Sequence, residues 1–190
     1  QMAMDLAASL IERGALDAGD LARRFAGSYR WSRGYGPGAA KVLRRIGRGA
    51  DWRAASRSVY PEGSFGNGGA MRAPVIGLFY AGRPEALIEA ARLSASITHA
   101  HPLGIEGAVL VASATALALR GCRPLEIMRG TAANCAIADF TARLEIAASW
   151  LSTGEEPTAN EVVKRLGNGI AASASCVTAL YVSMRFLERR

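Results

Sequence analysis

The stretch IEGAVLVASATALALR, residues 105–120, decides the fold of this chain. It is apolar and rich in alanine, and Gly121 follows it directly as a helix stop. His101-Pro102 interrupts the pattern just before it. A helix that is apolar around its circumference is buried by other elements. The stretch therefore predicts a helix that is buried on most of its sides.

Helical patterns also fill the chain on both sides of this stretch. Apolar residues from Met2 to Ile11 recur on one helical face, and Gly14 follows them as a stop. Asp20 is expected to cap a second helix. The other expected helices cover 39–46, 51–59, 73–80, 85–98, a segment that begins at Pro124, and 170–187. No segment alternates as a strand does, so the sequence predicts an all-α protein of about eight or nine helices.

The composition is that of one ordinary globular domain. The 190 residues are 50% hydrophobic and 21% charged. A chain of this length suits a single domain over residues 1–190. The net charge is +7, but the arginines are scattered over the expected helix faces. We therefore expect a generally basic surface and not a nucleic-acid-binding patch.

The sequence also bears on where the protein resides. Three cysteines without a CxxC pair fit a reduced cytoplasmic protein and no obvious metal site. Residues 1–13 contain Asp5, Glu12 and Arg13, which do not fit a signal peptide. The longest apolar run, Ala108–Leu119, has about 12 residues, against the ~20 that span a bilayer. We expect a soluble, cytoplasmic protein that does not enter a membrane.

A second stretch, GSFGNGGAMR at residues 63–72, raises a chemical question. Its glycines form either a turn between helices or a loop whose backbone N–H groups hold an anion such as phosphate. The stretch is not a P-loop, because no Lys-Ser or Lys-Thr pair follows, and it lacks the surroundings of a dinucleotide fingerprint. Ser64 and Asn67 offer side-chain hydrogen bonds, and Phe65 offers a stacking face. Composition alone leaves both interpretations open, with the structural turn ahead.

Two histidines, His99 and His101, form the next candidate group. They are either a metal pair or substrate contact, or structural residues. The structural interpretation is favoured: His101 caps the break before Pro102, and His99 is a core residue with its hydrogen bonds satisfied. No Asp-Asp or Asp-x-Asp pair occurs, and Glu155-Glu156 lies in a loop that is expected to be solvated. The residues alone therefore identify neither a catalytic group nor a metal ligand.

Four blocks of the sequence carry a resemblance to a known family. They are RGYGPGA (33–39), GSFGNGGAMRAPVIGLFY (63–80), SITHAHPLGIEGAVLVASATALAL (96–119) and LGNGIAAS (166–173). In this order and spacing they resemble an Arg-Gly-Tyr-Gly loop, a glycine-rich motif, a Thr-His block with an apolar helix, and a Gly-Asn segment. These are the motifs of the ADP-ribosylglycohydrolase family, and the resemblance covers nearly the whole chain.

The resemblance implies an orthogonal multi-helix bundle, all-α, with a cleft for ADP-ribose or an ADP-ribosylated protein. In the family, the glycine-rich loop wraps the diphosphate and the nearby ribose, and its aromatic residue stands near the adenine. His99 matches the histidine that approaches the ligand, and Asn168 matches the asparagine of the later loop. The residues implied to bind substrate are Gly63, Ser64, Phe65, Gly66, Asn67, Gly68, His99, Asn168 and Ile170.

The sequence departs from the family in its metal ligands. Family members carry two divalent cations, Mg2+ or Mn2+, on an early Thr-Asp-Asp and a late Asp-x-Asp-Thr/Ser motif. Neither motif occurs in this sequence. The early motif normally runs directly into Gln-Met, which are residues 1 and 2, and the late one normally follows just beyond Arg190. Ribosomal initiation would not supply Gln1, so the sequence looks like the central part of a family member, incomplete at both ends.

Three classes of function follow from the resemblance. The first is a metal-dependent hydrolase that cleaves the glycosidic bond between ADP-ribose and a protein side chain or related conjugate. The alternative is an ADP-ribose-binding module or pseudoenzyme without hydrolysis. A purely structural protein is the third class, and the presence of Ser64, Asn67, His99 and Asn168 argues against it.

Overall fold

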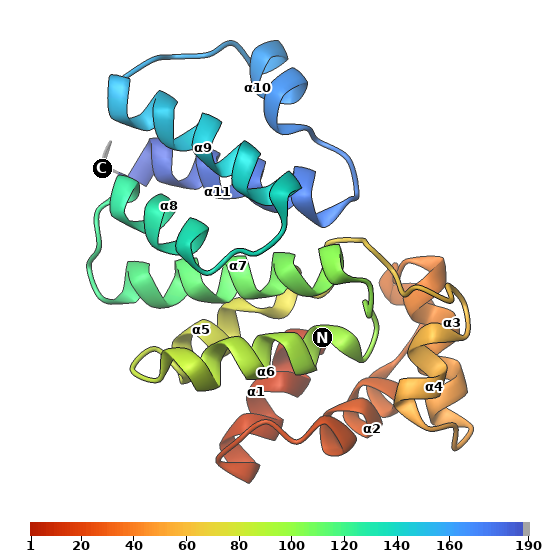
Figure 1. Cartoon of the computed structure of the whole chain (residues 1–190). Helices are drawn as coiled ribbons and strands as arrows, with labels where there is room; N and C mark the ends of the chain where they lie inside the picture. The colour runs from red at the N-terminus through yellow and green to blue at the C-terminus, as the bar shows by residue number, and fades with distance from the viewer. Residues whose placement is uncertain (188–190) are drawn as a thin grey trace.

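The computed structural model describes residues 1–187, which form an all-α protein (Figure 1). No β-strand occurs among these residues, and their eleven α-helices exceed the number expected from the sequence. The segment expected from Pro124 onward forms two helices, α8 (Pro124–Ala133) and α9 (Ala138–Thr153). Helix α10 (Ala159–Leu166) was not expected from the sequence. The helices are α1 (Met2–Arg13), α2 (Ala18–Ser28), α3 (Pro37–Gly47), α4 (Trp52–Arg57), α5 (Pro74–Phe79), α6 (Pro84–Ser96), α7 (Pro102–Leu119), α8 (Pro124–Ala133), α9 (Ala138–Thr153), α10 (Ala159–Leu166) and α11 (Ala172–Leu187).

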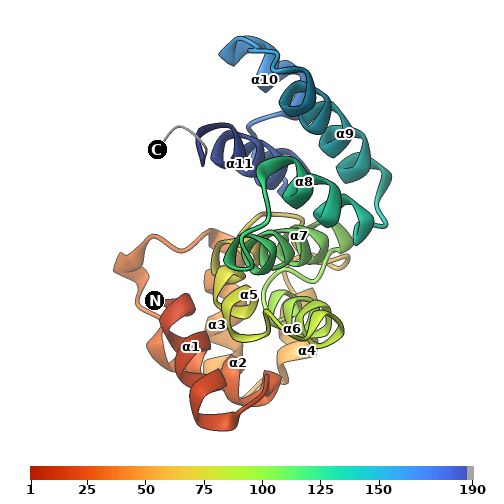
Figure 2. The same ribbon diagram turned by 90° about the vertical axis from the view of Figure 1, so that its left-hand side faces the viewer.

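Helix α7, which the sequence predicts to be buried, runs through the middle of the molecule. Figure 2 shows it nearly end-on, with α1 to α6 on one side and α8 to α11 on the other. Its residues Val109 and Ala112 belong to a hydrophobic cluster built mainly from α1 to α6. Leu110 and Ala114 belong to a second cluster, built mainly from α8 to α11. Opposite faces of one helix therefore join the two halves of the core.

Small residues let α7 approach its neighbours closely. A Cβ atom on Gly77 of α5 would lie 2.5 Å from the carbonyl oxygen of Ala112. A Cβ atom on Gly107 of α7 would lie 2.7 Å from the Cβ of Ala172 in α11. Both distances are well below the ~3.5–4.0 Å of a favourable contact between heavy atoms. Only glycine fits at these two crossings, so the small residues of this region permit close helix packing.

The length and composition of α7 would also allow it to cross a membrane. It is the one helix of the described part of the chain that meets this criterion, with 18 residues and a mean hydropathy of 1.6. With 18 residues, α7 is longer than the apolar run of about 12 residues from which we expected that no segment enters a membrane. Within the protein 56% of it is buried, and it packs against α5, α6, α8 and α11. Its apolar surface is thus largely buried by packing against other helices.

Several helix ends follow the signals in the sequence. Gly14 ends α1 in the left-handed conformation, with φ of 69°. The Asp51 side chain accepts hydrogen bonds from two backbone N–H groups at the start of α4. His101 Nδ1 accepts a hydrogen bond from the Leu103 N–H at 3.1 Å, which confirms that His101 caps α7. By contrast, Ile11 was expected on the packed face of α1 and is 77% exposed.

The predicted role of Asp20 as a helix cap is wrong. Asp17 caps α2, and Asp20 lies inside that helix with only 6% of its surface exposed. The Asp20 carboxylate accepts hydrogen bonds from Ser9 at 2.8 Å and from Arg13 and Arg24 at 3.0 and 2.6 Å. Burial alone would raise the pKa of Asp20, but the hydrogen bonds from these three side chains hold it far below its usual range. Asp20 therefore ties α1 to α2.

Candidate functional site

A cavity of about 590 Å³ lies beside the glycine-rich loop of residues 63–69, called the glycine loop below. Segments far apart in the sequence form its walls: the start of α1, the stretch 33–39 that leads into the first turn of α3 (called the 33–39 loop below), the glycine loop and His99. The lining residues are Gln1, Met2, Ala3, Arg33, Gly34, Tyr35, Gly36, Pro37, Gly38, Ala39, Tyr60, Ser64, Gly66, Asn67, Gly68, Met71, Arg72, His99 and Ile170. Two arginines and no carboxylate are among them, so the cavity favours anions. We call it the glycine-loop pocket.

Two glycines allow the glycine loop to lie against the chain around His99. Gly63 has a φ of +86°, and a Cβ atom there would lie 2.2 Å from the backbone nitrogen of His101. A Cβ atom on Gly68 would lie 2.6 Å from Nε2 of His99. Gly66 differs from both, because the nearest atom to a Cβ there would be 3.5 Å away. The first two glycines are therefore needed for the fold of the pocket, and Gly66 is not.

The start of α11 anchors the other side of the glycine loop. The Asn67 N–H donates to the Ile170 carbonyl at 3.1 Å, and the Ala172 N–H donates to the Phe65 carbonyl at 3.0 Å. This short antiparallel pairing is centred on a bridge between residues 66 and 171. The Asn67 side chain also donates from Nδ2 to Ser175 Oγ at 2.9 Å. The loop is thus held by both halves of the molecule.

Several polar groups of the pocket have no partner among the described residues. The backbone N–H groups of Ser64 and Gly68 donate to none of residues 1–187. The hydroxyl of Tyr35 is buried and is likewise unpaired within this part of the chain. Free backbone donors next to arginines bind anionic oxygen atoms, above all those of phosphate. The arrangement therefore suits a ligand that carries phosphate.

His99 presents one of its ring nitrogens to the pocket. Its Nδ1 lies 2.8 Å from Thr98 Oγ1, and its Nε2 lies on the side of Gly68. Burial and the nearby positive charge of Arg72 lower the pKa of His99 to about 3. The ring is therefore neutral near pH 7. His99 offers a hydrogen bond to a ligand and no positive charge.

Arg72 lies behind the glycine loop with only 2% of its surface exposed. Its guanidinium donates to the Ser94 carbonyl at 2.6 Å, to Thr98 Oγ1 at 3.0 Å and, at 3.5 Å, to the Gly68 carbonyl. It also lies over the Phe25 ring, 4.8 Å from the centroid. Burial lowers the pKa of Arg72 to about 9, so it keeps its charge near pH 7. A buried charge without a carboxylate partner favours an anion in the adjoining pocket.

The structure brings most of the predicted site residues together. Those that line the pocket are Ser64, Gly66, Asn67, Gly68, His99 and Ile170. Gly63 is buried at the start of the glycine loop, Asn168 is exposed, and neither lines the pocket. Phe65 also lies outside the lining, with its ring centroid 6.2 Å from that of His101. The ligand-binding role of each of these residues stays a prediction.

The part of the pocket lining that lies outside the glycine loop, His99 and Ile170 is missing from the predicted site. It consists mainly of the 33–39 loop, Tyr60 and the first residues of the chain. A signal existed for the 33–39 loop, because RGYGPGA concentrates glycine as the glycine loop does. No local pattern indicates Tyr60, whose ring would lie 2.7 Å from a Cβ atom on Gly38. Arg72 was missed because its burial is decided by tertiary packing.

The described residues do not form a site for a hard divalent cation. Within residues 1–187, no three side chains of His, Cys, Asp or Glu gather as metal ligands. The pocket lining contains hydroxyl and amide oxygens but no carboxylate. Mg2+ and Mn2+ are held in proteins mainly by carboxylates. The residues present therefore do not fit the two-cation site that the resemblance implies.

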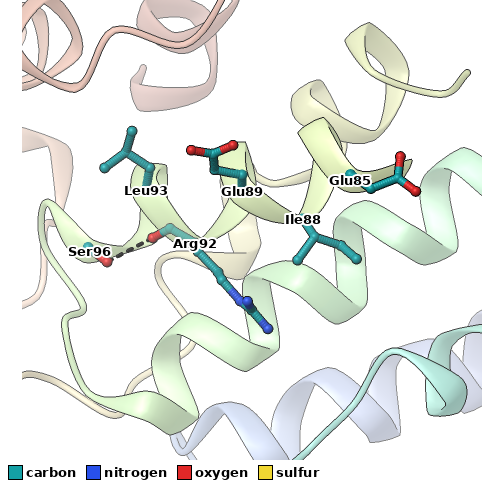
Figure 3. A pocket seen from close by; sticks show the side chains of 6 residues that line it. All are labelled: Glu85, Ile88, Glu89, Arg92, Leu93 and Ser96. Carbon is teal, nitrogen blue, oxygen red and sulfur yellow. Dashed lines mark hydrogen bonds between the residues drawn. The ribbon is translucent and has the colours of Figure 1, made fainter. Parts of the chain in front are cut away.

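A second hollow lies on the outer surface of α6 (Figure 3). Figure 3 shows Glu89 on one side of the helix and Arg92 on the other, so its polar groups do not converge. The hydrogen bond drawn there, from Ser96 Oγ to the Arg92 carbonyl at 2.8 Å, stays within the helix. The lining residues are Glu85, Ile88, Glu89, Arg92, Leu93 and Ser96. This hollow is a groove between surface side chains and not a candidate site.

Known proteins similar to this chain point to one family. A family model described as ADP-ribosylglycohydrolase matches residues 1–188. The chain is 36% identical to the ADP-ribosylhydrolase ARH3 of Homo sapiens, 37% identical to that of Bos taurus and 35% identical to that of Mus musculus. Each alignment covers 98% of this chain. The chain spans 58%, 57% and 56% of the respective relatives.

Proposed function

The chain belongs to the ADP-ribosylglycohydrolase family, and we propose that it forms the part of a hydrolase that holds ADP-ribose. The bond to be cleaved is the glycosidic bond between ADP-ribose and a protein side chain or a related conjugate. One observation carries this proposal: Ser64 and Gly68, whose backbone N–H groups have no partner within residues 1–187, line a pocket with two arginines and no carboxylate. A diphosphate would be matched there in charge and in hydrogen bonding.

We place the diphosphate of ADP-ribose against the glycine loop. The absence of a side chain at Gly66 lets phosphate oxygens approach the backbone closely. Arg33 and Arg72 line the same cavity and balance the negative charge of the diphosphate. Tyr35 and Tyr60 also line the cavity and offer aromatic surface for the base or the sugar. The cavity of about 590 Å³ is within the range of small-molecule sites.

The hydrolytic step needs groups that the described residues do not supply. Attack of water on the anomeric carbon requires activation of that water and stabilisation of the leaving group. The pocket lining has no carboxylate, and the His99 ring is neutral near pH 7. We therefore propose that the full-length protein carries the catalytic groups, including two Mg2+ or Mn2+ ions, on residues outside this chain. The three free cysteines, Cys122, Cys135 and Cys176, accord with the cytoplasmic location that we also propose.

The proposal is tested by measuring release of free ADP-ribose from an ADP-ribosylated protein. The assay compares the 190-residue chain with the full-length product of its gene, each with Mg2+ and with a chelator. We expect the full-length protein to release ADP-ribose in a reaction that the chelator stops. We expect the shorter chain to bind ADP-ribose and to release none, because its described residues form no cation site.

Each other outcome has a distinct meaning. Binding without release by either protein would replace the hydrolase with the alternative, an ADP-ribose-binding module or pseudoenzyme. Metal-dependent release by the 190-residue chain would show that its own residues form a cation site. Failure of both proteins to bind ADP-ribose would contradict the assignment of the pocket.

A further inference from the structure

Thr98 connects a buried arginine to the histidine of the glycine-loop pocket. It is 2% exposed, and its Oγ1 accepts a hydrogen bond from Arg72 Nη2 at 3.0 Å. The same oxygen lies 2.8 Å from His99 Nδ1. A guanidinium only donates hydrogen bonds, so the Thr98 hydroxyl proton is not directed at Arg72. Within the described residues, the remaining partner for that proton is His99 Nδ1.

This order of donors and acceptors selects one tautomer of His99. A neutral imidazole has one protonated and one bare nitrogen. If Nδ1 accepts the Thr98 proton, Nε2 carries the ring proton. Nε2 is the nitrogen on the pocket side, 2.6 Å from a Cβ atom built on Gly68 and 3.7 Å from one built on Gly66. The proton is thus presented beside the glycine loop.

We propose that Arg72 and Thr98 are positioning residues that hold His99 as its Nε2–H tautomer, so that His99 donates a hydrogen bond to the ligand in the pocket. The inference rests on the proposed ADP-ribose site and adds a chemical requirement to it. It also accounts for an arginine that is buried without a carboxylate partner. The same guanidinium donates to the Gly68 carbonyl at 3.5 Å, and so it fixes the loop opposite the ring as well.

The tautomer determines which ligand atoms this wall accepts. An N–H group at Nε2 pairs with a phosphate oxygen or with a lone pair of a ribose hydroxyl. The other tautomer would present the lone pair of Nε2, which repels a phosphate oxygen. The hydrogen bonds that link Arg72, Thr98 and His99 therefore make His99 complementary to an oxygen-rich, anionic ligand without giving the ring a charge.

The test combines a spectroscopic and a binding measurement on the 190-residue chain. Nitrogen NMR of the imidazole rings reports the tautomer in the absence of ligand, and calorimetry reports the affinity for ADP-ribose. The chain has two histidines, and His101 serves as an internal reference, because the Leu103 N–H fixes its Nδ1 as an acceptor. Thr98→Val removes the hydroxyl and keeps the shape, and Thr98→Ser restores the hydroxyl. Thr131→Val is the matched control, a threonine that is 1% exposed in α8.

We expect both histidines of the wild-type chain to be Nε2–H tautomers. In Thr98→Val the His99 signals alone should become those of a tautomer mixture, and the affinity for ADP-ribose should fall about five- to tenfold, the effect of one hydrogen bond. Thr98→Ser should recover both properties, and Thr131→Val should change neither.

Two results would overturn the inference. One is a wild-type His99 that carries its proton on Nδ1, a measurement that needs no variant. The other is a folded Thr98→Val chain with the wild-type tautomer and affinity. Absence of ADP-ribose binding by the wild-type chain would contradict the proposed function instead, and the tautomer of His99 would still be read in the ligand-free protein.

Discussion

At His99, burial of the ring and the neighbouring charge of Arg72 keep the histidine neutral. An ordinary histidine titrates near pH 6.5 and is partly cationic around neutrality. Burial and the charge of Arg72 lower the pKa of His99 to about 3. The positive charge of the pocket therefore comes from Arg33 and Arg72. The neutral His99 ring contributes a hydrogen bond of fixed orientation.

The lowered pKa of His99 predicts a loss of stability in mild acid. Between pH 6.5 and 3 the unfolded chain binds a proton at His99 that the folded chain does not, so stability falls as pH falls through this range. We expect the free energy of unfolding to drop by about 1–2 kcal/mol between pH 7 and pH 5. Urea unfolding at both values measures it. The interval from pH 7 to pH 5 lies above the pH at which Asp20 takes up a proton, which is about 3.9 in the unfolded chain and lower in the folded chain.

A matched variant identifies the source of this loss. In His99→Gln the side chain at this position no longer titrates, so the part of the acid effect due to His99 should vanish. Equal losses in the wild-type and His99→Gln chains would show that His99 is not held neutral by its surroundings.

At the scale of elements, the shape of the glycine loop depends on how α11 crosses α7. The loop pairs with residues 170–172 at the start of α11, and α11 lies close against α7 at Gly107. Ala172 takes part in both contacts, since its N–H donates to the loop and its methyl group faces Gly107. A change at this crossing is therefore expected to reach the pocket through the backbone.

Gly107→Val is predicted to disturb both stability and ligand binding. A Cβ atom at this position would lie 2.7 Å from the Ala172 Cβ and 3.1 Å from Cys176 Sγ. Overpacking of this kind costs about 1–3 kcal/mol, which chemical denaturation measures, and ADP-ribose binding should weaken as the start of α11 moves. Gly27→Val in α2 is the control, because a Cβ there would have no neighbour within 4 Å. Equal stability of the two variants would contradict the close crossing.

At the scale of the whole molecule, the sequence predicted the fold more fully than the site. Local chemistry determines that Gly14, in the left-handed conformation, ends α1 and that His101 caps α7. The apolar pattern of residues 105–120 identifies α7 as a buried helix. Asp17 and Asp20 carry the same local capping signal, and only packing against α1 decides between them. The glycine loop was visible from its composition, because glycine is kept where backbone must come close to other atoms.

The rest of the pocket could not be read from local patterns. The part of its lining outside the glycine loop forms only when the 33–39 loop, Tyr60 and the first turn of α1 meet in space. The burial of Arg72 depends on its contacts with Ser94 and Thr98, which are more than twenty residues away in the chain. Tertiary packing, and not periodicity, places these groups around the pocket.

The central claim is that the glycine-loop pocket holds ADP-ribose against its backbone, and a calorimetric titration of ADP-ribose tests it most directly. The wild-type chain is predicted to bind one ADP-ribose saturably, and Gly66→Val to bind it more weakly by about 2 kcal/mol, roughly thirtyfold. A Cβ atom on Gly66 would have its nearest neighbour at 3.5 Å, so the variant should stay folded, and Gly27→Val should bind as the wild type does. No saturable binding by the wild-type chain, or an unchanged affinity in folded Gly66→Val, would contradict the account.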